Sequence, residues 1–268
     1  MGRPDWAAED IDLNTPSVAR AYDYILGGAH NFAADREYAR ELLAMLPDFR
    51  EIALANRAFL HRAVRFMVKA GVRQFLDIGS GVPTVGNVHE IAQKLDPKSR
   101  VVYVDIDPVA VMHSRQILAN NDLATVVQED LRRPEAILDH PHTRATLDFD
   151  QPVGLILVAV LPAVPDRDDP YGIMARLRDE LCPGSYVAIS HGTADRRGDE
   201  IRAAVSATRR TTTPVTVRTR DEVLRFFAGF ELVEPGVVWS AQWRPDSPED
   251  VGDHPERLMM YAGVGRKP

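Results

Sequence analysis

The amino-acid sequence predicts an α/β fold built on one doubly wound, mainly parallel sheet, preceded by a helical N-terminal extension. From residue 73 onward, short apolar runs alternate with helical segments, which is the pattern of repeated βαβ units. The apolar runs are nearly continuous, as expected for strands that helices cover on both faces. The chain has 268 residues, of which 45% are hydrophobic, so it can bury one large core without a second independent domain. We therefore assign residues 1–70 to the extension and residues 71–268 to one compact unit.

The extension is predicted to contain three helices. In the first helix, Thr15 is the cap and Pro16 lies in the first turn, and the Gly27-Gly28 pair ends the helix. The second is expected at residues 35–46. The third runs from about residue 47 to residue 70, where Gly71 marks its end.

Five parallel strands and a closing antiparallel hairpin follow the extension. The parallel strands are predicted at residues 74–78, 101–105, 124–128, 153–158 and 185–190. Thr219 and Glu222 have the spacing of a capping box, so we expect a helix there that ends near Gly229. Strands at residues 230–242 and 258–264 come next, joined by a loop rich in proline. Two strands in succession indicate a terminal antiparallel pair.

The composition argues against several classes of protein. The net charge of −7 is unlike that of a duplex nucleic-acid binder, which concentrates cations against phosphates. Cys182 is the one cysteine, so an intrachain disulfide and a zinc site with several thiolates are both excluded. We expect no metal and a cytoplasmic location. The N-terminus lacks the apolar core of a signal peptide, and the longest apolar run, at residues 153–164, is too short to span a membrane.

The strongest chemical signal is the turn that follows the first strand. Asp77, Ile78, Gly79, Ser80 and Gly81 form an acid-x-Gly-x-Gly sequence between a strand and a helix. Two glycines let the backbone bend sharply and approach a ligand closely, while the next helix offers free N–H groups. We expect all five residues to bind a nucleotide-like cofactor.

The acid in this turn distinguishes two classes of cofactor. A nicotinamide or flavin dinucleotide fold needs a third glycine, and Thr84 stands at that position. That fold also has no need of Asp77. A carboxylate there instead suits the positively charged amino group of S-adenosylmethionine, contacted directly or through water.

Two more acids stand at the ends of the next two strands. Asp105, followed by Ile106, is placed to accept hydrogen bonds from both ribose hydroxyls, whereas Asp107 is expected to cap the next helix. Asp130 can accept a hydrogen bond from an adenine amino group, and Leu131 can pack against the adenine ring. Singly, Asp130 could equally be an ordinary loop acid. Three acids at successive strand ends suit three parts of one nucleoside.

Together with residues 181–190 before and along the fifth strand, these motifs resemble class I S-adenosylmethionine-dependent methyltransferases, which have a Rossmann-like methyltransferase sheet with a terminal antiparallel hairpin. Residues 14–28 and 31–36 are similar to an actinobacterial family of such proteins whose substrates are unassigned. The resemblance covers essentially the whole chain. It implies S-adenosyl-L-methionine as the cofactor and a helical N-terminal lid folded over it.

The resemblance also suggests which residues of the lid reach the cofactor. The polar or closely approaching candidates are Arg20, Tyr22, Tyr24, Gly28, His30 and Asn31. The alternative is a packing helix with ordinary amphipathic tyrosines. The Gly27-Gly28 turn would allow a close approach.

Candidates for the catalytic groups come from the ends of the fourth and fifth strands. The segment containing Ala159 and Val160 resembles the part of methyltransferases that flanks the transferred methyl group, and its backbone is expected to contact the cofactor. Many relatives have histidine where this chain has Pro162. His191, directly after the fifth strand, is then the candidate general base, with a buried structural histidine as the alternative.

The function predicted from the sequence is methyl transfer from S-adenosylmethionine to a small-molecule acceptor. An oxygen, nitrogen or carbon of the acceptor would attack the methyl group in line, and a base is optional for a neutral amine or a readily ionised phenol. A non-catalytic S-adenosylmethionine-binding regulatory module is the alternative, because Pro162 replaces a potential base. No duplex nucleic acid or membrane is expected as a partner.

Overall fold

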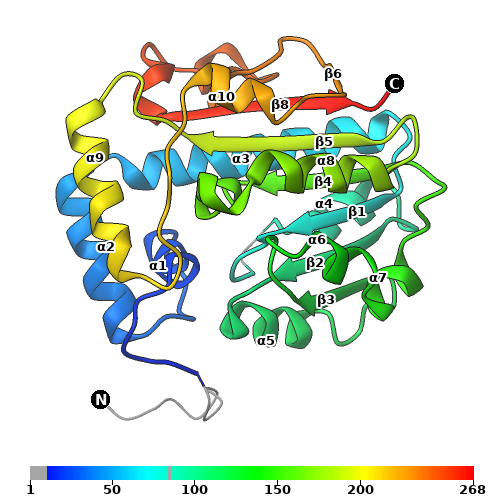
Figure 1. Cartoon of the computed structure of the whole chain (residues 1–268), viewed down its shortest axis with the longest axis horizontal. Helices are drawn as coiled ribbons and strands as arrows, with labels where there is room; N and C mark the ends of the chain where they lie inside the picture. Colours follow the sequence, from blue (N-terminus) through cyan, green and yellow to red (C-terminus); the bar gives the residue numbers. More distant parts are fainter. Residues whose placement is uncertain (1–10, 84–85) are drawn as a thin grey trace.

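The computed structural model of the chain describes residues 11–83 and 86–268. Its centre is an eight-stranded sheet with the order β3-β2-β1-β4-β5-β8-β6, in which β7 also pairs with β8. Strands β1 to β5 are parallel, and β8 runs antiparallel to β5 (Figure 1). This arrangement confirms the predicted doubly wound sheet. The strands are Gln74–Ile78 (β1), Arg100–Asp105 (β2), Ala124–Gln128 (β3), Val153–Val158 (β4), Tyr186–Gly192 (β5), Glu231–Leu232 (β6), Val238–Trp239 (β7) and Met260–Arg266 (β8).

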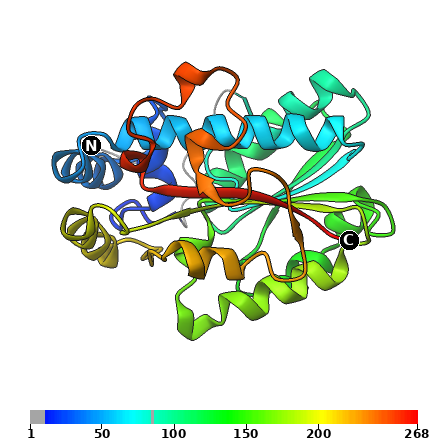
Figure 2. The same ribbon diagram turned by 90° about the horizontal axis from the view of Figure 1, so that it is seen from above.

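Helices cover both faces of the sheet, as the continuous apolar strands require (Figure 2). On one face lie α3 (Phe49–Lys69), α4 (Val88–Leu95) and α5 (Pro108–Ile117). On the other face lie α6 (Pro134–Leu138), α8 (Pro170–Glu180) and α10 (Arg220–Arg225), and α7 (Pro141–Thr146) packs beside α6. Phe59, Ala63 and Met67 of α3 are fully buried in the same core as the strand residue Phe75. Helix α3, the last helix before β1, therefore belongs to the layer of helices that covers this face of the sheet.

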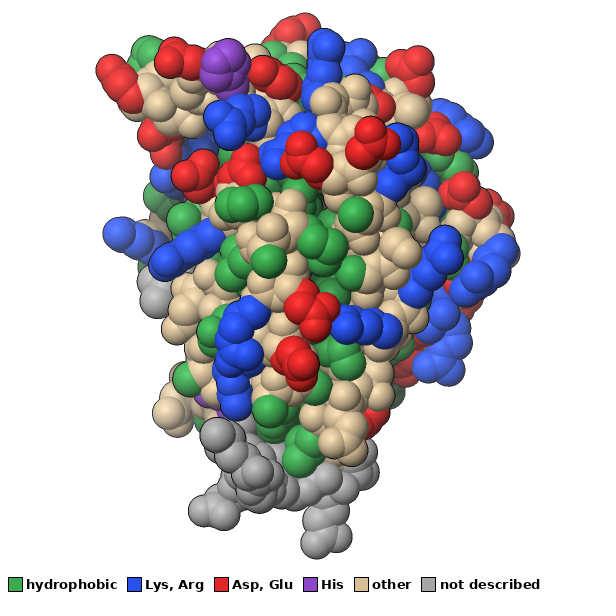
Figure 3. Space-filling model, turned by 90° about the vertical axis from the view of Figure 1, so that its left-hand side faces the viewer, with side chains coloured by type: hydrophobic (Ala, Val, Ile, Leu, Met, Phe, Trp, Pro, Cys, Tyr) green, Lys and Arg blue, Asp and Glu red, His purple; other side chains and the backbone are tan. Residues whose placement is uncertain are grey.

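Three other helices form a separate layer beyond the carboxyl ends of the parallel strands (Figure 1). They are α1 (Val18–Ile25), α2 (Ala33–Met45) and α9 (Gly198–Ala207), and we call this layer the lid. Its apolar core includes Ala21, Leu42 and Ile201, one from each helix. Helix α9 was not predicted from the sequence. The outer surface of the lid carries Arg interspersed with Asp and Glu (Figure 3).

The lid begins two residues later than the sequence predicts. Helix α1 starts at Val18, and its cap is Ser17, whose side chain accepts a hydrogen bond from the Arg20 N–H. Thr15 is not the cap, because its N–H and that of Asn14 bind the Asp12 carboxylate in a preceding turn. The prediction for Thr15 and Pro16 was therefore wrong.

The C-terminal region confirms the antiparallel pair but not its length. The predicted strand at residues 230–242 is divided into β6 and β7, which both pair with β8. Pro235 and Gly236, with a φ of 86° at the glycine, lie between the two short strands and turn the chain. The predicted capping box is present, since Thr219 and Glu222 bind each other's backbone N–H groups at α10. That helix ends at Arg225, before the predicted Gly229. Among the helices of residues 11–83 and 86–268, none has both the length and the apolar character to cross a membrane.

Candidate active site

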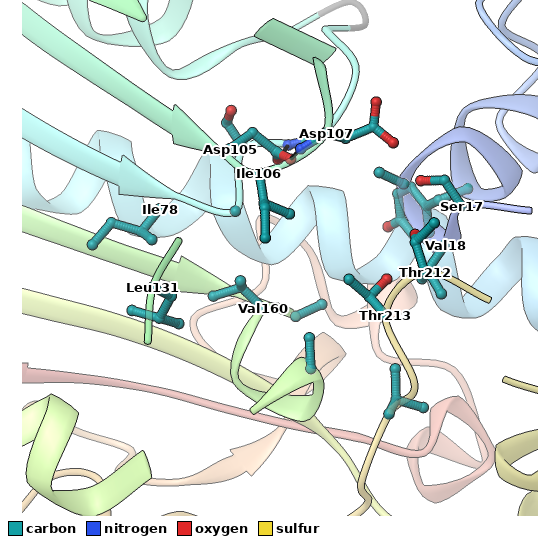
Figure 4. Close-up of a pocket in the computed structure, with 18 of the residues that line it drawn as sticks. Ser17, Val18, Ile78, Asp105, Ile106, Asp107, Leu131, Val160, Thr212 and Thr213 are labelled. Carbon is teal, nitrogen blue, oxygen red and sulfur yellow. Dashed lines mark hydrogen bonds between the residues drawn. The ribbon is translucent and has the colours of Figure 1, made fainter. Parts of the chain in front are cut away.

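A cavity of about 1020 Å³ lies between the carboxyl ends of the parallel strands and the lid (Figure 4). Residues after β1, β2, β3 and β4 form one wall. Residues of α1 and of the segment 205–217 form the opposite wall. Ligands of open α/β sheets bind at this edge, where the strand order reverses between β1 and β4.

The glycine turn after β1 leaves room for a ligand and is tied to the end of β2. The N–H groups of Gly79 and Ser80 donate to the Val104 carbonyl, at 2.8 and 3.2 Å. Gly79 has a φ of 74°, and a Cβ there would lie 2.2 Å from a methyl carbon of Val160, so both conformation and space require glycine. The Ser80 hydroxyl is buried and has no hydrogen-bond partner among the described residues. The turn is therefore a preformed cradle with one unused polar group.

Asp77 and Asp105 place two buried carboxyl groups beside this turn. Burial raises the pKa of Asp77 to about 7, while the nearby Arg57 guanidinium acts in the opposite direction. Burial raises the pKa of Asp105 to about 6, opposed by the N–H groups of Asp107 and Gly81. These N–H groups donate to Asp105 at 2.9 and 2.6 Å. Two carboxyl groups of raised pKa stabilise a cationic ligand better than an anionic one.

The other predicted acids have different environments. Asp107 caps α5 by accepting a hydrogen bond from the Val109 N–H, as predicted, and its second carboxylate oxygen faces Arg20. Asp130 lines the cavity, but its carboxylate is bound by the Arg132 guanidinium, with nitrogen-oxygen distances of 2.5 to 3.0 Å. This ion pair and its hydrogen bonds lower the pKa of Asp130 against the effect of burial.

The apolar residues predicted for the cofactor all line the cavity. Ile78, Leu131 and Val160 lie on the strand-end side of the cavity, and Ile106 lies between them and the lid (Figure 4). Ile106 is 44% exposed, which is unusual for a large apolar side chain and leaves it available to a ligand. Ala159, also in the wall, has a φ of 59°, a strained conformation for a residue with a Cβ.

The lid residues proposed from the sequence divide into two groups. Arg20 and Tyr22 line the cavity, and the Tyr22 hydroxyl donates to the Ala53 carbonyl at 2.9 Å. The remaining four residues lie outside the cavity wall and hold the lid together. These four are Tyr24, Gly28, His30 and Asn31.

The contacts of the second group explain its position. The side-chain amide of Asn31 donates to Asp23 and to the Gly28 carbonyl, at 2.8 and 3.0 Å. A Cβ at Gly28 would lie 1.9 Å from an Asp23 carboxylate oxygen, so the glycine permits this packing. The His30 ring lies against His113 of α5, with 3.6 Å between ring centroids and an angle of 45° between the ring planes. These side chains position the lid from outside the cavity.

His191 does not have the geometry of a general base. It is fully buried and lies outside the residues that line the cavity. Its Nε2 lies 2.9 Å from an Arg218 guanidinium nitrogen and accepts from it, so its Nδ1 donates to the Gly192 carbonyl at 2.8 Å. Burial lowers the pKa of His191 to about 3, so the ring stays neutral. The structural alternative describes this residue, and the assignment as a base is corrected.

Comparison with known proteins now identifies the family. A family profile described as S-adenosyl methyltransferase matches residues 4–268. The chain belongs to this S-adenosyl methyltransferase family. Its cofactor is S-adenosyl-L-methionine, and the resemblance drawn from the sequence is confirmed. No curated protein matches the chain at a significant level.

Two solved structures from actinobacteria resemble this methyltransferase-family chain along its length. A DUF574 family protein from Streptomyces avermitilis is 42% identical, with a TM-score of 0.92, and the match covers 96% of this chain and 99% of that one. A candidate methyltransferase from Thermobifida fusca is 41% identical, also with a TM-score of 0.92, over 98% and 99% of the two chains. The N-methyltransferase NodS from Bradyrhizobium japonicum shares 12% identity over 93% of this chain and 99% of its own, with a TM-score of 0.51, and so shares the fold alone.

The cavity of this methyltransferase-family chain suits its cofactor. S-adenosyl-L-methionine carries positive charge on its sulfur and its amino group, and the cavity offers the buried carboxyl groups of Asp77 and Asp105. The open space at Gly81, where a Cβ would meet no atom within 4 Å, and the unused Ser80 hydroxyl fit a polar amino-acid tail. Thr84, which bears on the dinucleotide alternative, lies outside the described residues. Within the described ranges, no three His, Cys, Asp or Glu side chains are grouped to hold a metal ion.

Several residues of the cavity were missed by the sequence analysis. Asn56 and Arg57 of α3 line it, as do Arg209 and the segment 212–217 after α9. The apolar residues that recur at helical spacing in α3, such as Ile52, Phe59 and Met67, indicate only which side enters the core, and Asn56 interrupts this stripe as a buried amide. A buried polar residue within an apolar stripe is a usable signal. Nothing local marks the segment 212–217.

Proposed function

We propose that this chain transfers a methyl group from S-adenosyl-L-methionine to a small-molecule acceptor held between the strand ends and the lid. The observation that supports this most strongly is that one cavity joins the acid-bearing ends of β1 and β2 to a wall of apolar and polar side chains supplied by α1 and the segment 205–217. A cofactor bound along the strand ends would leave space against that second wall for an acceptor.

In this proposal, the carboxyl groups and the glycine turn hold the cofactor. Asp77 would bind the cofactor's amino group, and Arg57, whose charge acts on Asp77, would bind the carboxylate of the same tail. Asp105 would accept from the ribose hydroxyls with the lone pairs that the Gly81 and Asp107 N–H groups leave free. Ile78, Gly79, Ser80 and Gly81 would line the path of the tail.

The adenine ring would lie against the apolar residues beside β2 and β3. Ile106 would cover one face of the ring, and Leu131 would pack against its other side. Asp130 would remain available to an adenine amino group only through oxygen lone pairs that Arg132 does not occupy. Ala159 and Val160 would contact the cofactor near its sulfur.

When bound, the cofactor supplies the methyl group on a positively charged sulfur. The residues of this chain then orient the acceptor, exclude water and hold both molecules in line, effects that contribute up to about 7–11 kcal/mol in well-arranged intramolecular reactions. None of the described residues that line the cavity is a histidine. Proton removal by a protein base is unnecessary when the acceptor is a neutral amine or an ionised phenol.

The test measures binding and transfer separately. Titration calorimetry with S-adenosyl-L-methionine and with S-adenosylhomocysteine should show binding to the full chain, and NAD should not bind. Transfer of an isotopically labelled methyl group is then measured across a panel of phenols, amines and carboxylic acids. Binding without transfer to any of them would favour the non-catalytic module, and absence of binding would overturn the proposed function.

A further inference from the structure

The wall of the cavity that faces the strand ends differs from them in charge. Within the segment 205–217, all of which the structure describes, no Asp or Glu lines the cavity, whereas Arg209 does. Arg167, which follows β4, lies at the rim on the strand-end side, next to Asp166, which pairs with the buried Arg218 and does not line the cavity. The segment 205–217 therefore places a cation opposite the carboxyl groups of Asp77 and Asp105.

Arg209 is a cation of this wall that has no partner among the described residues. It is exposed, and it forms no ion pair or hydrogen bond with the described residues. Its neighbour Arg210 instead pairs with Glu41 and lies 5.5 Å from the centre of the Tyr38 ring, on the α2 side. Arg167 is 81% exposed at the rim, 3.7 Å from Asp168. Arg209 therefore lies in the cavity wall, whereas its neighbour Arg210 faces helix α2 of the lid.

The rest of this wall combines an apolar surface with free hydroxyl groups. The hydroxyls of Thr212, Thr213 and Thr216 form no hydrogen bond within the described residues. Thr212 and Thr213 lie opposite Ile106 and Val160 (Figure 4). The apolar members of the segment 205–217 that line the cavity are Val205, Pro214, Val215 and Val217.

The backbone fixes this wall in place. The Thr212 N–H donates to the Pro16 carbonyl at the start of the lid, and the Thr216 N–H donates to the Pro162 carbonyl after β4, at 3.0 and 2.7 Å. The segment thus bridges the lid and the sheet. Two lid acids, Asp12 and Asp23, also line the cavity, but N–H groups of the lid itself bind both carboxylates.

We propose that the acceptor is an apolar molecule that bears a carboxylate or a comparable oxyanion, and that Arg209 binds this group. The apolar body would lie along the segment 212–217, and the nucleophilic atom would face Val160 at the strand ends. An amine-bearing acceptor would place its charge against the same arginine and bind less well. This inference rests on the proposed function and names its class of substrate.

The test uses three probes that share one ring system: 2-naphthoate, 2-naphthamide and 2-naphthylmethylamine. Each is titrated calorimetrically into the full chain saturated with S-adenosylhomocysteine. We expect the naphthoate to bind about 5- to 20-fold more tightly than the amide, as a hydrogen-bonded charge pair in a partly enclosed site would give. Higher salt should weaken binding of the naphthoate more than that of the amide.

Matched variants identify the arginine. Arg209→Ala should abolish the preference for the carboxylate and Arg209→Lys should keep part of it, whereas Arg210→Ala should leave it unchanged. Equal binding of the acid and the amide, a preference for the amine, or failure of all three probes to bind would overturn the inference while leaving the cofactor result intact. If S-adenosylhomocysteine itself does not bind, the proposed function fails and this inference fails with it.

Discussion

A guanidinium nitrogen of Arg20 lies 3.6 Å from a carboxylate oxygen of Asp107, which joins the first helix of the lid to the residue that caps α5. The same arginine donates to Asp35 of α2 at 2.9 Å and to the Thr15 carbonyl at 2.8 Å. Arg20, Asp35 and Asp107 are all buried, and two of them line the cavity. One cation therefore links two lid helices to the sheet at the edge of the proposed cofactor site.

Removing this cation should strongly destabilise the protein. In Arg20→Met, two buried carboxylates lose their partner, and breaking a buried pair in this way costs about 3–5 kcal/mol. Urea denaturation should show this loss in the free energy of unfolding. Arg65→Met is the control, because Arg65 pairs with Asp246 at the surface and such pairs contribute about 0–1 kcal/mol. Similar stability of the two variants would rule out the role assigned to Arg20.

The glycine turn gives a prediction that separates steric contact from backbone strain. Gly79→Ala adds a Cβ that would lie 2.2 Å from Val160, and Gly71→Ala adds one at a similar positive φ with no atom within 4 Å. We expect Gly71→Ala to cost about 1 kcal/mol and Gly79→Ala about 1–3 kcal/mol more. Calorimetry should also show weaker binding of S-adenosylhomocysteine to Gly79→Ala alone.

A second substitution tests whether Val160 is the obstacle. In the double variant Gly79→Ala, Val160→Gly, all three Val160 atoms that meet the new Cβ, at 2.2, 2.4 and 3.3 Å, are removed. Most of the stability that Gly79→Ala loses through the steric contact should then be restored. Only the loss caused by the positive φ should remain. If the double variant is no more stable than Gly79→Ala, the contact with Val160 does not explain the requirement for glycine.

The strand ends could be predicted from the sequence because their signals are local. A continuous apolar run predicts a buried strand, and the residues that follow it necessarily lie at the edge where parallel strands end. Asp77, Asp105 and Leu131 were located by this reasoning, and all three line the cavity. The cap at Asp107 follows from two adjacent residues and is equally local.

The environment of a side chain could not be predicted where distant segments create it. His191 is inaccessible because Arg218, 27 residues further along the chain, returns to its ring. Asp130 is a strand-end acid like the others, but Arg132 occupies its carboxylate. The cavity wall formed by the segment 205–217 depends on the position of α9. That position is set by packing against α2, a tertiary contact between distant segments of the chain. Sequence pattern gives the position of a residue on an element, and packing decides what that residue touches.

Asp77 should couple cofactor binding to pH. Its pKa of about 7 means that a cationic ligand must compete with a proton, since the ionised carboxylate binds the cation. The affinity for S-adenosyl-L-methionine should therefore rise as the pH increases from 6 to 8, by up to about tenfold per pH unit below the pKa. Calorimetry at several pH values checks this. Asp77→Asn should bind more weakly and lose the dependence, and an unchanged pH profile in that variant would exclude Asp77 as its source.

The raised pKa of Asp77 also predicts how the stability of the ligand-free protein depends on pH. The pKa of Asp77 is higher in the folded state than its ordinary value of 3.8, so the folded state holds more protons between about pH 4 and 7. The free energy of unfolding should fall as the pH rises through that window. Asp77→Asn should remove this decrease and be more stable than the unsubstituted protein at pH 8, by about 1–3 kcal/mol. Equal stability of the two at pH 8 would contradict the burial argument.

His191 should affect stability rather than cofactor binding. In His191→Ala the buried Arg218 loses an acceptor and a cavity forms beside the stacked Phe226 ring, changes that together cost about 2–4 kcal/mol. Affinity for S-adenosylhomocysteine should stay within about twofold, because the ring lies outside the cavity wall. His191→Gln keeps an acceptor for Arg218 and should lose less stability than the alanine variant.

The pH dependence of unfolding tests the neutral state of His191. Its pKa is about 3 in the folded state and 6.5 ordinarily, so the unfolded state binds the extra proton between these values. The contribution of the neutral His191 ring to the free energy of unfolding should therefore be complete above pH 6.5 and decline as the pH falls toward 3. The difference in unfolding free energy between the unsubstituted protein and His191→Gln should shrink over that range. A difference that is constant with pH, together with methyl transfer lost in a fully stable His191→Ala, would restore the general-base hypothesis.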